Sequence, residues 1–82
     1  MITGTQVRMA RAALKWGVRD LADAAEVSPA TVTRIEGGHP ANSATLTVIR
    51  TALEKAGVQF TPADNGGEGV RLRHGPGAGE AA

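Results

Sequence analysis

The sequence predicts a mainly α-helical domain that ends in a β-hairpin, and two periodicities along its 82 residues predict this fold class. Over residues 5–57, apolar side chains recur every three to four positions, the spacing of helices that bury one face. Over residues 58–73, apolar and polar residues alternate one by one around a segment rich in turn residues, which is typical of a hairpin. One Trp, one Phe and abundant Ala, Val and Thr suit short, closely packed helices.

The first two predicted helices cover about residues 5–16 and residues 18–25. Thr5 is the expected N-cap of the first helix, and Gly17 ends it because glycine favours helix termini. Asp20 lies in the first turn of the second helix, where the helix dipole favours a carboxylate. The residues expected to face the core are Val7, Ala10, Leu14, Leu21, Ala22 and Ala25.

The third and fourth predicted helices, residues 29–36 and about 43–56, have the strongest boundary signals. Ser28 is a good helix cap, and Pro29 follows it at the first helical position, where a missing N–H is tolerated. Glycines follow both helices and end them. The fourth helix begins near Asn42 or Ser43, and its apolar stripe consists of Leu46, Ile49 and Leu53.

The predicted hairpin carries four apolar residues that water should not contact, namely Val58, Phe60, Val70 and Leu72. An isolated two-stranded hairpin is only marginally stable in water, so we expect these side chains to be covered. Three placements are open: the side chains pack between two subunits, the strands pair with those of a second subunit across a two-fold axis, or the hairpin folds onto the fourth helix of the same chain. The expected organisation is a helical domain (1–57), a hairpin and candidate dimerisation element (58–73) and a disordered Gly/Ala-rich tail (74–82).

Composition excludes several classes of protein. The chain has no cysteine and two separated histidines, so we expect no disulfide, no metal and no other cofactor. No apolar run approaches the roughly 18 residues that span a bilayer, and no signal-peptide pattern opens the chain. We therefore expect a cytoplasmic protein with no membrane partner. The sequence contains no nucleophile–base pair and no phosphate-binding glycine loop, so we do not expect an enzyme.

Charge is distributed unevenly along the chain. The net charge is only +1, but the first nineteen residues carry four positive charges and no negative one. Such a skew is compatible with a surface that faces phosphates, although solvated faces often have the same composition.

Residues 21–36 (LADAAEVSPATVTRIE) resemble the helix-turn-helix of the Cro/C1-type (XRE) regulators. The matching features are the small residue Ala22, the apolar turn residue Val27, the Ser-Pro cap and the Ile-Glu end. The similarity extends into the flanking helices, from about residue 5 to residue 57. It implies a lambda-repressor-like domain of four or five helices that binds double-stranded DNA as a dimer, with helix 29–36 in the major groove.

The resemblance also assigns the residues that contact DNA. The base-reading positions would be Pro29, Ala30, Thr31, Thr33 and Arg34. Their chemistry is suitable, because arginine can donate two hydrogen bonds to guanine, and threonine offers both a hydroxyl and a methyl group. The candidates for phosphate contacts are Ser28, Gln6, Arg8, Arg19, Asn42 and Ser43.

Some of these side chains have structural alternatives. Arg11 and Glu36 are spaced as the buried ion pair of this family, which implies that they join the first helix to the end of the third rather than contact DNA. Arg8 is equally compatible with a solvated position, and Ser28 caps its helix whether or not it touches phosphate. Trp16 is expected to cover the edge of the small core.

The sequence departs from the family pattern at two positions. Glu26 stands at a turn position that is usually glycine, because the backbone there has a positive φ. Val18 stands where many members have a glutamine that contacts a phosphate, so we expect the second helix either to bind the backbone less tightly or to bind it through Arg19.

Together these features predict a sequence-specific transcriptional regulator. A homodimeric repressor that occupies an inverted-repeat operator is the leading hypothesis. The alternative is an antitoxin or another interaction module, which would bind a protein partner through its hairpin or tail and also bind its own operon.

Overall fold

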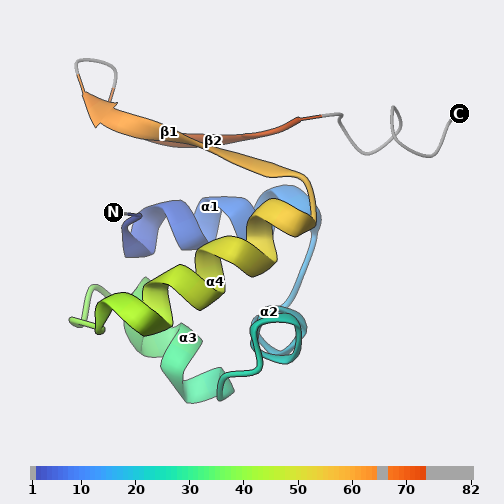
Figure 1. Ribbon diagram of the computed structural model, residues 1–82, viewed down its shortest axis with the longest axis vertical. Coiled ribbons are helices and arrows are strands. Elements are labelled where there is room, and N and C mark those ends of the chain that lie inside the picture. The colour runs from blue at the N-terminus through green and yellow to red at the C-terminus, as the bar shows by residue number, and fades with distance from the viewer. Residues whose placement is uncertain (1, 65–66, 74–82) are drawn as a thin grey trace, which may run out of the picture.

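The computed structural model describes residues 2–64 and 67–73. Its elements, in order, are α1 (Gly4–Leu14), α2 (Val18–Ala25), α3 (Pro29–Glu36), α4 (Ser43–Lys55), β1 (Val58–Asp64) and β2 (Gly67–Leu72). Figure 1 shows the hairpin and α3 at opposite ends of the long axis, with α1 and α4 between them. The predicted fold class, mainly helical with a C-terminal hairpin, is confirmed. The tail expected at residues 74–82 lies outside the described residues.

The start of α1 differs from the prediction. Thr3, not Thr5, is the N-cap: its hydroxyl accepts the backbone N–H of Gln6 at 3.1 Å, and the Gln6 side chain accepts the N–H of Thr3 at 3.1 Å. This reciprocal capping box satisfies two backbone donors at once, which a lone Thr5 cap would not. The helix also ends earlier, at Leu14, because Lys15 adopts a left-handed conformation with φ 60°.

The core is formed by the inner faces of the four described helices, together with Ile2 before α1 and the first residue of β1. Val7, Leu21 and Val32 are fully buried there, so α1, α2 and α3 each contribute to it. Trp16 is half-buried and packs against the edge of this core. The remaining buried apolar residues are Ile2, Ala10, Ala22, Ala25, Ile35, Ile49, Leu53 and Val58.

The beginning of α1 lies directly against the end of α3. A Cβ atom added to Gly4 would stand 2.0 Å from the carbonyl oxygen of Ile35, well inside van der Waals contact. Glycine is therefore required at this point by a close backbone approach. The contact determines how near α1 and α3 can come, and so contributes to the placement of α3.

The hairpin folds onto the helices of its own chain, with β2 packed on α1 and β1 on α4. Val58 is 1% exposed, so its assignment to a dimer interface is wrong: this side chain is part of the chain's own core. Phe60, Val70 and Leu72 are half-buried against the same core. Of the placements open from the sequence, the structure shows packing within one chain, on α1 as well as on the expected fourth helix.

Candidate nucleic-acid interface

The turn between α2 and α3 is built around Glu26. This residue ends α2 in a left-handed conformation, with φ 58° and ψ 44°, and the N–H of Val27 then donates to the carbonyl of Ala22 at 3.0 Å. A side chain in this conformation costs about 1 kcal/mol relative to glycine, which packing of the adjoining helices offsets. Glu26, in place of the glycine that the resemblance implies, therefore leaves the turn geometry intact.

The first turn of α3 is fixed by its cap. The Ser28 hydroxyl accepts the backbone N–H of Thr31 at 3.1 Å and lies 2.8 Å from the Thr31 hydroxyl, while Pro29 occupies the first helical position. The cap satisfies a backbone donor that has no partner within the helix. Because the Thr31 hydroxyl is turned back toward Ser28, it is less free to contact a base than an outward-facing hydroxyl.

The two faces of α3 are clearly different. Val32 and Ile35 are buried against the core, whereas Pro29, Ala30, Thr33 and Arg34 are exposed and Thr31 is half-buried. Within the described residues, no ion pair or hydrogen bond holds the Arg34 guanidinium. The exposed strip of α3 therefore offers small, hydroxyl-bearing and cationic side chains to a ligand.

The start of α4 adjoins this strip. Thr31 and Arg34 share a shallow hollow of about 240 Å³ with Pro40, Asn42 and Thr45. Asn42 caps α4 by accepting the N–H of Thr45 at 2.8 Å, which leaves its side-chain NH₂ group available. Exposed Asn42 is thus brought close to α3, as its assignment to a phosphate contact requires, and exposed Ser43 follows it as the first residue of α4.

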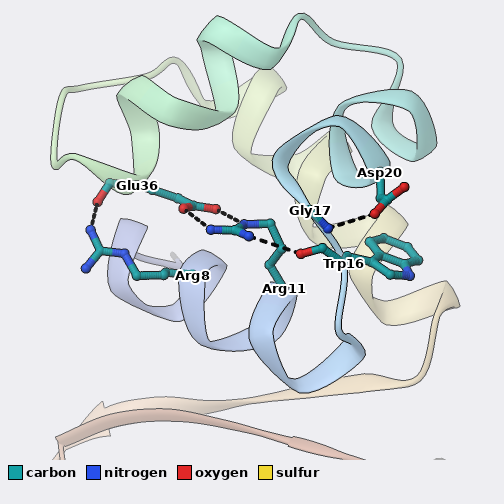
Figure 2. Close-up of polar contacts among 6 residues, drawn as sticks. All are labelled: Arg8, Arg11, Trp16, Gly17, Asp20 and Glu36. Carbon is teal, nitrogen blue, oxygen red and sulfur yellow. Dashed lines mark hydrogen bonds and ion pairs between the residues drawn. The ribbon is translucent and has the colours of Figure 1, made fainter.

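The other end of α3 is held by an ion pair with α1 (Figure 2). Arg11 donates from Nε to Glu36 Oε2 at 2.8 Å and from Nη2 to Glu36 Oε1 at 2.9 Å. The Glu36 side chain is only 8% exposed, and the hydrogen bond to it raises the pKa of Arg11 above its ordinary value. A third bond, from Arg11 Nη1 to the carbonyl of Trp16 at 3.0 Å, links the pair to the α1–α2 connection.

Arg8 also lies at this end of α3. Its Nη2 donates to the backbone carbonyl of Glu36 at 2.8 Å, as Figure 2 shows. The last carbonyls of a helix have no partner within the helix and carry partial negative charge, so a cation is favoured there. Arg8 is exposed and is anchored to α3 in a way that the sequence analysis did not anticipate.

The structure contradicts the assignment of Gln6 to a phosphate contact. Gln6 is 4% exposed, and its Nε2 donates to the carbonyls of Thr61 on β1 and Gly69 on β2, at 2.8 and 3.0 Å. Its amide therefore joins α1 to both strands and faces away from solvent. The Thr3-x-x-Gln6 capping pattern was a sequence signal that could have indicated a structural rather than a DNA-contacting Gln6, though not its bonds to the strands.

The N-terminus of α2 is capped from within the chain. Asp20 Oδ2 accepts the N–H of Gly17 at 2.7 Å, so a carboxylate occupies a donor that could otherwise meet a phosphate (Figure 2). Val18 carries no polar group, and Arg19 is exposed on the first turn of the helix. Of Val18 and Arg19, only Arg19 can contact a phosphate through its side chain.

An exposed third helix, joined by a tight turn to a second helix and supported by two others, is the arrangement of helix-turn-helix DNA-binding domains. The chain matches the family model described as a helix-turn-helix domain over residues 3–62, and it belongs to this family. The match covers all four helices and the first part of β1. Comparisons with curated proteins and with solved structures gave no match.

Residues 2–64 and 67–73 carry neither a membrane-spanning helix nor a cluster of metal-binding side chains. None of the helices in these ranges has the length and apolar character needed to cross a membrane. The same ranges contain no group of three or more His, Cys, Asp or Glu residues that could hold a metal ion.

The ion pair predicts a stability difference between two glutamine substitutions. Glu36→Gln should lower the free energy of unfolding by about 2 kcal/mol, because it leaves the half-buried Arg11 charge without its counter-ion. Glu54→Gln is the matched control: the Arg50–Glu54 pair has a similar 2.9 Å distance, but both side chains are more than 40% exposed. Glu54→Gln should lower the free energy of unfolding by no more than about 0.5 kcal/mol. Urea unfolding followed by circular dichroism would measure both, and equal losses would contradict the structural role of Glu36.

Proposed function

We propose that the chain is a sequence-specific transcriptional regulator of the XRE type, which recognises the major groove of double-stranded DNA with α3. The observation that carries this proposal is the asymmetry of α3: Val32 and Ile35 are buried, Glu36 is paired, and Arg34 is exposed with no partner among the described residues. A helix held rigidly on one side and open on the other is preorganised to enter a groove.

Three side chains are best placed to contact bases. Ala30, Thr33 and Arg34 are exposed at positions three and four apart, which lie along one face of a helix. Arg34 can donate two hydrogen bonds to a guanine, Thr33 can bond to a base edge, and Ala30 can pack on a thymine methyl group. Pro29 adjoins them at the helix start, and Thr31 contributes from the border of the strip.

Phosphate contacts would flank this strip on two sides. Ser28 stands at the start of α3, and Asn42 and Ser43 stand at the start of α4 beside the hollow that Arg34 also lines. Helix N-termini present unpaired N–H groups to anions, which suits both places. Arg19 and Arg8, both exposed, extend the cationic surface along α2 and past the end of α3.

The regulator would act as a homodimer on an inverted repeat. A two-fold pair of chains presents two copies of α3, and the operator then mirrors the symmetry of the protein. Occupation of such an operator within a promoter excludes RNA polymerase, which makes repression the simplest mode of action.

Selection of bound duplexes from a random pool would test this function. We expect enrichment of a motif with two-fold symmetry, because each copy of α3 would select one half-site. Enrichment of a single asymmetric half-site would support DNA recognition and contradict the dimer. A pool that shows no sequence preference after repeated rounds would overturn the proposed function.

Arg34→Ala should weaken binding to the selected site by about 1–3 kcal/mol and relax the preference at one base position. Arg50→Ala is the matched control, since Arg50 is exposed but lies over the Phe60 ring of the hairpin, away from α3. Fluorescence anisotropy with specific and random duplexes would measure both variants. An equal loss on the two duplexes would assign Arg34 to a phosphate rather than to a base.

A further inference from the structure

We propose that β2 is the edge at which two copies of this chain pair. The two β2 strands would run antiparallel about a two-fold axis at Val70 and form a four-stranded sheet. This inference rests on the dimer of the proposed function and assigns the surface that forms it. It concerns the edge of the hairpin, since the inner face already packs on the chain's own helices.

The backbone of the hairpin has free hydrogen-bonding groups along its outer edges. The N–H of Arg73 donates to the carbonyl of Gly57 at 2.7 Å, so these two residues form a hydrogen-bonded pair. Two positions further along, Gln59 and Arg71 form the next pair of this kind. Hydrogen-bonded and non-hydrogen-bonded pairs alternate in an antiparallel ladder. The backbone groups of Val70 and Leu72 therefore point away from β1, and no described strand pairs with them.

The edge of β1 is less suited to pairing. The register shifts between Thr61 and Asp64, where β1 carries an extra residue, whereas β2 runs regularly from Gly69 to Leu72. By the same alternation, the outward position after Phe60 is Pro62, which has no N–H to donate. A bulge and a proline are two of the features that keep natural edge strands from pairing. β2 has neither over this stretch.

The charges of β2 favour one register. With Val70 opposite its own copy, Arg71 lies opposite Gly69 of the second chain, and Arg73 lies opposite Gly67. Each exposed cation then faces a residue without a side chain. A shift that centred the pair on Arg71 would place two like charges directly opposite each other, which is unfavourable.

The position of the hairpin in the fold supports edge pairing over face pairing. In Figure 1 the sheet covers one end of the molecule, and α3 lies at the opposite end. A two-fold axis that relates antiparallel edge strands is perpendicular to the sheet, so both copies of α3 stay on the same side of the dimer. Contact between the outer faces of two hairpins would instead direct the two copies of α3 to opposite ends. Of these two arrangements of the hairpins, edge pairing is the one that can place both copies of α3 on one DNA duplex.

The absence of cysteine from the sequence allows a direct test with single thiols. Arg71→Cys and Gln59→Cys would each be labelled with pyrene, which forms an excimer only when two labels are in contact. Both residues are exposed, and they lie opposite each other on the outer face of the hairpin. In the proposed dimer, the two copies of residue 71 are diagonal neighbours about 7–8 Å apart. The two copies of residue 59 are separated by two further strand spacings, about 10 Å more.

We expect excimer emission from Arg71→Cys, its loss when excess unlabelled chain is added, and none from Gln59→Cys. Excimer emission from Gln59→Cys alone would place the interface on β1 and overturn the proposal. If neither variant shows excimer emission, the proposed β2 interface is also overturned. This holds whether sedimentation shows the unsubstituted chain to be a dimer, which must then form elsewhere, or a monomer. Because these measurements need no DNA, they separate the two proposals: a chain that pairs at residue 71 but selects no DNA sequence retains the interface and loses the function.

Discussion

The carboxylate of Glu36 is held at the point where three segments of the chain meet. Arg11 bonds to both of its oxygens from α1, and the same guanidinium reaches the carbonyl of Trp16 before α2 begins. Close by, Arg8 binds the backbone carbonyl of Glu36, and Gly4 permits α1 to approach Ile35. In a chain too short for a large core, these contacts determine the direction of α3, and every DNA contact proposed for α3 depends on that direction.

Holding α3 by its end and its inner face leaves its outer strip unoccupied. Two polar side chains of α1 are used within the fold, since Gln6 binds the hairpin and Arg11 binds Glu36. Arg34 has no such partner among the described residues, and this contrast distinguishes the recognition surface from the scaffold. The hairpin lies at the far end from α3, so pairing of two chains and recognition of DNA can use separate surfaces.

Sequence patterns predicted the parts of the fold that depend on neighbouring residues. The Ser28-Pro29 cap and the spacing of Val32 and Ile35 were enough to locate α3, and the change to alternating residues located the hairpin. The interpretation of Gln6 was wrong because its partners are the carbonyls of Thr61 and Gly69, more than fifty positions away. The local capping pattern with Thr3 could have indicated that Gln6 is structural, but distant backbone acceptors leave no trace in side-chain patterning. For the same reason, the contact from Arg8 to the end of α3 could not be predicted.

The most direct test of this account is a map of backbone amide chemical shifts during titration with the selected duplex. The account predicts that the largest changes fall on residues 28–34 and on the start of α4 at residues 42–45. Amides of the core-facing side of α1 and of β2 should change little once the dimer has formed. If the largest changes instead fell on residues 67–72, with α3 unaffected, the hairpin would be the DNA-binding element and the central claim would be contradicted.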